Sequence, residues 1–386
     1  MELQILGVTR NSFCNTLTLM YVESLLRCLI FLFANVLLSG MLLADEPVTL
    51  ANAEEVAKEL GLDSDGRAGQ NLPEQQIREK FSLDAATRFL DASSLYWQKQ
   101  QKCFSCHTNY PYLMARPFIV ADDTAHQQVR AFAEQTVTEQ WPEKESVINY
   151  EVISTASILA FNDAFQTGRL HDVTRQALAH MWTIQRDDGG FDWIRANTAP
   201  SELDDHYGVT LALIGVGAAP DGYASTPQAQ QGIKKLRDYL AENPTQYPHQ
   251  SAMLLWATSY IDSLLTPEDQ QRRVDELWAL QQKDGGWSLL SLGNWPFRGK
   301  GGESVAKLSD GYGTGLVTYV LRRSGVPVDD VRITQAIHWL KSNQRANGSW
   351  LTRSQSDPGG HHSISRAGSA YAIMALAICD ELQNVE

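Results

Sequence analysis

Two carboxyl groups and an imidazole are adjacent in the sequence at Asp204, Asp205 and His206, and Glu202 precedes them by two residues. A carboxylic acid can donate a proton when neighbouring carboxylates and a cationic partner keep it protonated and acidic. Asp204 and Asp205 could form such a pair beside His206. The same residues could instead cap the helix expected to begin near His206, since Asp is a common N-cap residue, or contact a ligand or a metal.

A second group able to do chemistry is Cys103-Phe104-Ser105-Cys106-His107. Cys-x-x-Cys-His is the spacing of a c-type haem attachment site, in which two thioethers hold the porphyrin and the histidine binds the iron. A disulfide between Cys103 and Cys106, or a zinc or redox role, is the alternative. Beyond the N-terminal segment only Cys379 joins this pair, so the cysteines do not indicate a disulfide-stapled scaffold.

No small cytochrome fold surrounds the cysteine pair, so a second axial ligand would come from elsewhere in the chain. The candidates are Met114, His206, His249, His361 and His362, each of which could equally be a cap or a surface side chain. Aromatic residues near the motif could cover a haem, namely Phe104, Tyr110 and Tyr112. Tyrosines also recur near later helix starts, where they could line a cavity or pack in the core: Tyr150, Tyr207, Tyr247 and Tyr312.

The segments that must position these groups are repeats. Three read alike: Trp182-x-x-Gln185-x-x-Asp188-Gly-Gly-Phe191, Trp278-x-x-Gln281-x-x-Asp284-Gly-Gly-Trp287 and Gln344-x-x-Asn347-Gly-Ser-Trp350. Asp or Asn followed by Gly supplies a helix stop and a tight turn. The aromatic can then fold back onto the helix it has left, and Gln can bond across neighbouring turns. A fourth copy, Trp97-x-x-Gln100-x-x-Cys103, puts the cysteine motif at a repeat turn.

Helix-period runs between these turns predict six helical hairpins. The expected pairs are 84–101 with 109–120, 123–140 with 146–165, 169–185 with 204–219, 227–241 with 248–264, 267–282 with 310–324, and 330–344 with 363–383. The second helix of each pair is the more apolar and should lie inside. Six such hairpins can bury their faces by closing into a ring, an all-α toroid, with an open superhelix as the alternative. The long connections 186–203 and 283–309 should shape its mouth.

The turns at Gln185, Gln281 and Gln344 resemble the QW repeats of squalene-hopene cyclases and related triterpene cyclases, over most of residues 84–386. The segment from Glu202 to Leu213 is similar to the Asp-x-Asp-Asp-Thr-Ala acid motif of those enzymes. This resemblance to the terpenoid cyclase and protein prenyltransferase toroids implies an α/α toroid and a catalytic role for Asp204 and Asp205. The chain departs from the cyclases at Glu202 and His206, and it is long enough for one helical domain where they have two.

Other toroid families match less well. The zinc site of protein prenyltransferases and the thioester of complement-like toroids are absent from the sequence. In polysaccharide-lyase toroids a Pro-Gln pair follows the turn tryptophan, and no such pair follows Trp287 or Trp350.

Composition and charge limit the possible partners and the location of the protein. The 386 residues are 43% hydrophobic with a net charge of −13, and no basic stripe is present, which argues against a nucleic-acid partner. The apolar run 28–44 follows Arg27 and is typical of a secretory signal, cleaved near Ala44 or retained as an anchor. Export agrees with the resemblance to cytochromes c, whose haem is attached outside the cytoplasmic membrane. We therefore expect an extracytoplasmic, periplasmic protein with peripheral membrane association possible.

These observations give a domain organisation and three hypotheses for function. Residues 1–44 form the signal or anchor, 45–83 an N-terminal extension, and 84–386 the toroid. The leading hypothesis is an exported cyclase-like toroid with a covalent haem c at its mouth, working in redox chemistry or electron delivery on an apolar or isoprenoid-like ligand. The alternatives are a haem-free enzyme that cyclises or isomerises an isoprenoid through Asp204 and Asp205, and a non-catalytic binding module.

Overall fold

The computed structural model describes residues 46–62, 76–102, 104, 108–120, 123–196, 199–201, 203–298, 302–355 and 364–382. The chain divides into two compact units, Met1–Pro47 and Val48–Glu386, and almost all described residues belong to the second. Within these ranges the regular structure is helical, apart from two isolated β-bridges, Ile77 with Arg345 and Gln344 with Trp350. No helix among them is long and apolar enough to cross a membrane, and the predicted export segment 28–44 lies outside them.

The described helices of the second unit form the six predicted hairpins. The outer members are α3 (Leu83–Gln101), α5 (Thr124–Gln135), α8 (Asp172–Thr183), α10 (Pro227–Glu242), α12 (Pro267–Trp278) and α15 (Val331–Ser342). The inner members are α4 (Asn109–Ala115), α7 (Asn149–Gln166), α9 (Asp205–Ala218), α11 (Pro248–Thr258), α14 (Gly311–Arg323) and α16 (Ile364–Ile378). The inner helices are buried along nearly their whole length, as their apolar composition predicts.

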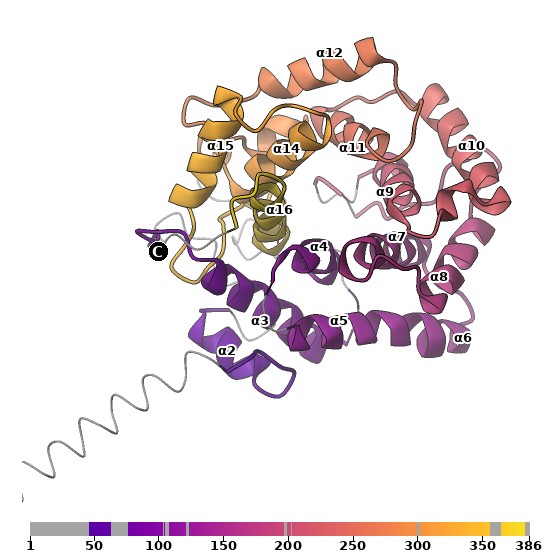
Figure 1. Cartoon of the computed structure of the whole chain (residues 1–386), viewed down its shortest axis with the longest axis horizontal. Helices are drawn as coiled ribbons and strands as arrows, with labels where there is room; N and C mark the ends of the chain where they lie inside the picture. The colour runs from indigo at the N-terminus through magenta and orange to yellow at the C-terminus, as the bar shows by residue number, and fades with distance from the viewer. Residues whose placement is uncertain are drawn as a thin grey trace, which may run out of the picture. The chain divides into compact units, whose positions relative to one another are not determined.

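The inner helices close into a ring. Each contacts the next, from α4 through α7, α9, α11 and α14 to α16, and α16 in turn contacts α4. Figure 1 shows this unit as an inner circle of helices inside an outer one. The predicted α/α toroid is therefore confirmed, and an open superhelix is excluded.

The three repeated glutamines each tie one outer helix to the next. The Nε2 of Gln185 donates to Gly189 O (2.9 Å) in its own turn and to Gly232 O (3.1 Å) in α10. Gln281 Nε2 does the same toward Gly285 O and toward Arg332 O in α15. Gln344 Nε2 donates to Gly348 O and to the oxygen of Ser82, the N-cap of α3. This last bond joins the end of the repeat array to its beginning.

The Gly turns adopt the geometry that the sequence predicts. The first glycine of each turn has a φ of 88°, 90° or 92°, at Gly189, Gly285 and Gly348, a conformation that only glycine adopts at little cost. The aromatic then folds back onto its own outer helix, since the Nε1 of Trp287 donates to Leu277 O (2.8 Å) and that of Trp350 to Leu340 O (2.7 Å). All these turns lie in the connections that lead from an outer to an inner helix.

Two details differ from the predictions. Helix α4 ends at Ala115 and continues only as the short 3-10 turn Arg116–Phe118, because Pro117 cannot supply the next helical hydrogen bond. In the fourth copy, Gln100 does not take the place of the other repeat glutamines. Helix α3 continues through Gln101, so Gln100 is an exposed helical residue, whereas the other three glutamines follow the ends of their helices.

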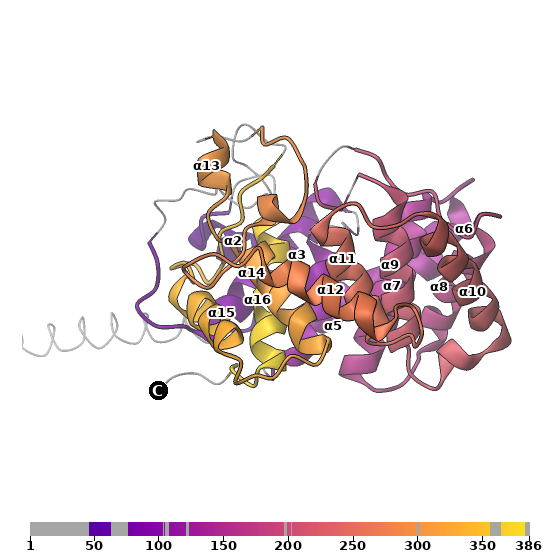
Figure 2. The ribbon, with the colours of Figure 1, turned by 90° about the horizontal axis from the view of Figure 1, so that it is seen from above.

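Shorter elements complete the unit. Helix α2 (Ala53–Glu59) packs on α3, and α5 continues through a π-helical turn (Thr136–Gln140) into α6 (Trp141–Glu143). The remaining short elements are η3 (Tyr223–Ser225), η4 (Leu289–Leu292) and α13 (Gly302–Ala306). Figure 2 shows α13 standing clear of the other helices at one end of the ring.

Candidate functional site

A cleft of about 490 Å³ opens where α9 and α11 begin. A much smaller cavity of about 10 Å³ lies against it and shares several lining residues, among them Asp204, His206 and Trp295. The long connections contribute to the cleft through Leu203 and through the segment Asn294–Pro296, as predicted. Small-molecule sites have volumes of roughly 300–1,000 Å³, so the cleft is large enough for one.

Asp204 both caps α9 and lines the cleft. Its Oδ1 accepts a hydrogen bond from the backbone N–H of His206 (3.0 Å), so the predicted capping role is confirmed. Its Oδ2 accepts from the side-chain amide of Gln250 in α11 (2.9 Å). Gln250 Oε1 in turn accepts from Gln246 N–H (2.6 Å), which ties together the starts of α9 and α11. Burial raises the pKa of Asp204 above its usual range.

His206 is the most unusual polar group at the cleft. The side chain is buried, with 5% exposed, and neither ring nitrogen has a hydrogen-bond partner in the described part of the chain. Burial, helped by the positive charge of Arg273, lowers the pKa of His206 to about 4, so the ring is neutral at pH 7. A neutral imidazole offers one donor and one acceptor, and each costs free energy while buried without a partner.

His249 lies behind His206 in a buried aromatic group. Its Nε2 and the hydroxyl of Tyr312 are 3.1 Å apart, and its ring stacks on Tyr207 at 6.0 Å. Tyr371 forms hydrogen bonds with both Tyr207 and Tyr312. Burial, with a smaller effect of His206, lowers the pKa of His249 to about 3. Two of the predicted tyrosines therefore join the histidine in the core of the ring, below the cleft.

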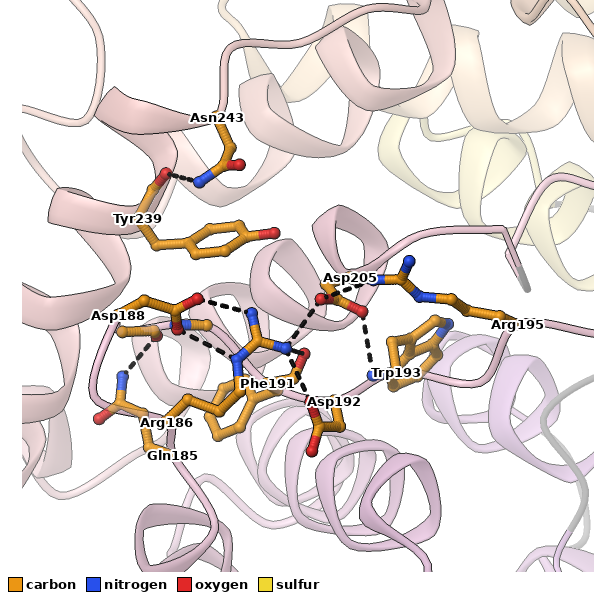
Figure 3. Close-up of polar contacts among 12 residues, drawn as sticks. Gln185, Arg186, Asp188, Phe191, Asp192, Trp193, Arg195, Asp205, Tyr239 and Asn243 are labelled. Carbon is orange, nitrogen blue, oxygen red and sulfur yellow. Dashed lines mark hydrogen bonds and ion pairs between the residues drawn. The ribbon is translucent and has the colours of Figure 1, made fainter.

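Asp205 points away from this group and into an arginine network (Figure 3). Its Oδ2 pairs with Arg186 Nη1 (2.8 Å) and Arg195 Nη2 (3.0 Å), and its Oδ1 accepts from Trp193 N–H (3.2 Å). Arg186 also pairs with Asp188 and Asp192. A carboxylate held by two guanidinium groups is suited to fixing a loop rather than to donating a proton.

The other predicted site residues fall in two groups. Cys103, Cys106, His107, Glu202, His361 and His362 lie outside the described residues. Met114 is described and buried in α4, with 2% of its side chain exposed. Among the described residues, no cluster of three or more His, Cys, Asp or Glu side chains could hold a metal ion.

Several cleft and network residues were not predicted. Arg186 and Arg195 reach Asp205 from the connection after α8, and Gln250 reaches Asp204 from α11. The sequence offered one usable signal, which was the position of Arg186 immediately after a repeat glutamine. Trp295 comes from an irregular connection, where no periodicity marks it.

Comparison with known proteins identifies no family for this chain. No protein-family model and no curated protein matches the chain. Among solved structures, a polysaccharide lyase is 12% identical in sequence with a TM-score of 0.48, and the match covers 78% of this chain and 96% of that one. The helical ring itself is established by the contacts described above.

Proposed function

We propose that this protein is an extracytoplasmic c-type haem protein, in which a helical toroid carries haem c for redox chemistry or electron delivery. The supporting observation is the motif Cys103-Phe104-Ser105-Cys106-His107 and its place in the chain. Its described neighbours Lys102 and Thr108 end α3 and begin α4, so the motif belongs to an outer-to-inner connection. The cleft and the repeat turns belong to connections of the same kind.

The described residues beside the motif fit a haem. Phe104 is buried and meets the ring of Tyr110 edge-on at 4.6 Å, which supplies apolar surface. Asn109 is fully buried, and neither atom of its amide has a hydrogen-bond partner among the described residues. Arg366 of α16 is buried, donates to Thr108 Oγ1 (3.1 Å) and lies over the ring of Trp97. A buried amide and a buried guanidinium suit the propionate edge of a haem.

In this proposal each residue named below would have one role when haem is bound. Cys103 and Cys106 hold the porphyrin through thioethers, and His107 binds the iron on one face. Bound haem would supply a one-electron couple, and the positive charge of Arg366 would suit its carboxylates. The apolar run 28–44 supports export to the compartment where such haem is attached.

The test is production of the full chain in a host that matures c-type cytochromes. We expect a c-type visible spectrum that changes on reduction, and haem that stays with the protein in a denaturing gel. Cys103→Ala and Cys106→Ala should each abolish this covalent haem. Cys379→Ala is the matched control, because Cys379 is buried at the end of α16 and should leave the haem unchanged.

Two results would contradict the proposal. One is a parent protein that carries no haem although the maturation machinery is active on another cytochrome in the same cells. The other is a haem band of equal strength in the parent, Cys103→Ala and Cys106→Ala proteins.

One observation, the environment of Asp204, supports the alternative hypothesis of a haem-free acid–base enzyme. The carboxyl group of Asp204 lines the cleft beside a neutral His206, and its pKa is raised. The predicted pair with Asp205 has less support, because that carboxylate is held by Arg186 and Arg195. Asp204→Asn should abolish turnover of an isoprenoid if this alternative holds, while the covalent haem proposal requires no such turnover.

A further inference from the structure

The cleft is lined by both aromatic and polar side chains. Aromatic surface comes from Tyr239, Tyr247 and Trp295, of which Tyr247 and Trp295 have ring centroids 6.1 Å apart. The same lining includes the amide and carboxyl groups of Glu242, Asn243, Gln246 and Asn294. None of the described lining residues is Lys or Arg. The cleft therefore offers stacking surfaces and hydrogen bonds, with a negative rather than a positive charge.

Two lining side chains carry buried polar atoms that lack partners. His206 has one donor and one acceptor of this kind, and the indole Nε1–H of Trp295 is a further donor without a partner in the described residues. Trp295 is 8% exposed and His206 5% exposed. Such atoms cost free energy in the free protein, and a ligand that pairs with them recovers it.

The number and kind of these atoms restrict the ligand. Unpaired donors at Trp295 and His206 require acceptor atoms, which an ammonium or guanidinium group does not have. The unpaired acceptor at His206 requires a donor, which a carboxylate or phosphate does not have. Hydroxyl groups supply both. An isoprenoid chain supplies neither and would leave all three atoms unpaired.

Charge narrows the class further. Asp204 and Glu242 line the cleft and none of the described lining residues is Lys or Arg, so uronates, phosphates and diphosphates would be repelled. We propose that this cleft binds a neutral carbohydrate, a short chain of uncharged sugar rings that stack on Trp295 and Tyr247 while their hydroxyl groups pair with His206, Trp295 and the amides of the rim. This site does not depend on the haem proposal, because its described lining comes from the starts of α9 and α11, the end of α10, the connection from α10 to α11 and the 283–309 connection.

Calorimetric titration of the full chain tests the proposal. The neutral probes are cellotetraose, maltotetraose, mannotetraose and xylotetraose, and the discriminating probes are tetragalacturonate, spermidine and farnesol. We expect at least one neutral tetrasaccharide to bind, and to bind more tightly than any discriminating probe. The result should be the same for protein prepared with or without haem, which separates its failure from that of the proposed function.

Two variants locate the binding. Trp295→Phe keeps an aromatic ring and removes the indole N–H, so affinity should fall about tenfold. Gln246→Ala changes an exposed residue of the rim, which should not disturb folding, and should weaken binding severalfold. The control is Trp278→Phe, which alters a tryptophan of the outer helix α12 that lies beneath Arg332 and away from the cleft. Thermal unfolding of each variant confirms that the fold is retained.

The proposal is overturned if no neutral tetrasaccharide binds, or if tetragalacturonate, spermidine or farnesol binds more tightly than all of them. It is also overturned if Trp295→Phe and Gln246→Ala both bind with the parent affinity.

Discussion

Asp205 and Asp310 occupy equivalent places at the starts of α9 and α14. Each accepts the backbone N–H of the residue two positions after a turn aromatic, Trp193 for Asp205 (3.2 Å) and Leu289 for Asp310 (2.7 Å). In the last repeat the hydroxyl of Ser365 accepts the equivalent bond from Thr352 N–H (2.9 Å). Because a hydroxyl can replace the carboxyl group here, the shared role is to hold the loop against the inner helix.

The surroundings of the two carboxyl groups differ. Asp205 is buried, with 5% exposed, but it pairs with Arg186 and Arg195, whose side chains are partly exposed. Asp310 is buried, with 1% exposed, and its other oxygen accepts from Gly313 N–H (2.8 Å). Burial raises the pKa of Asp310 to about 7. Asp205, which belongs to the segment that resembles the cyclase acid motif, is thus the ion-paired carboxylate. Asp310, whose pKa is strongly raised, belongs to no motif recognised in the sequence.

The largest effect should come from Asp310→Ala, measured by urea unfolding at pH 5. The change leaves the backbone N–H groups of Leu289 and Gly313 buried without partners. At about 1–3 kcal/mol for each, the free energy of unfolding should fall by roughly 2–6 kcal/mol. Asp329→Ala, an exposed acid before α15, is the control and should change it by less than about 0.5 kcal/mol. A loss no larger than in the control would show that Asp310 does not hold its loop.

The pH dependence of stability should separate the two sites next. The folded protein keeps a proton on Asp310 at pH values where the unfolded chain, with an ordinary carboxyl pKa near 4, has released it. The native state then binds more protons than the unfolded state, so this group's contribution to stability is full below about pH 4 and is lost as the pH rises toward 7.

The matched variant is Asp310→Asn, which cannot titrate. Between pH 5 and 7 the unfolding free energy of the parent should fall by about 2 kcal/mol relative to the variant. Parallel curves for the two proteins over this range would mean that the proton is not held.

The sequence predicted the ring well because the residues of its turns have specific conformational requirements. Asp or Asn followed by Gly needs a left-handed residue, and Gly189, Gly285 and Gly348 all have it. The same turns follow the ends of three outer helices, α8, α12 and α15. By contrast, the copy at Trp97 lacks a glycine, and there the helix continues past Gln100.

The sequence predicted the role of a site residue only where the neighbouring residues alone determine that role. Asp204 caps α9 because capping depends on the next two residues alone. The pairing of Asp205 with Arg195 and the presence of His206 and Trp295 in one cleft depend on how the connections fold over the ring, and neither has a periodic signal. The motif at Cys103 stays a prediction from sequence.

A smaller loss should follow Asp205→Ala. The variant leaves the Trp193 N–H without its acceptor, but Arg186 keeps Asp188 and Asp192 as partners near solvent. We expect the free energy of unfolding to fall by about 1–2 kcal/mol, less than for Asp310→Ala. Asp192→Ala also removes a partner of Arg186, from an exposed position, and should cost less than about 0.5 kcal/mol. Equal losses for Asp205→Ala and Asp310→Ala would remove the distinction between the two sites.

The smallest effect should be that of Arg195→Ala. The side chain of Arg195 is 67% exposed, and its pair with Asp205 duplicates the one that Arg186 makes from a less exposed position. Exposed ion pairs contribute at most about 1 kcal/mol, and salt screens them. The variant should therefore lose less than about 1 kcal/mol in dilute buffer and almost nothing in 1 M NaCl. Arg186→Ala should lose more at both salt concentrations, because Arg186 also donates to Phe191 O (2.9 Å), a bond within the repeat turn. If Arg195→Ala proved the more damaging of the two, Asp205 would be held chiefly by Arg195, further along the connection, rather than by Arg186 of the repeat turn.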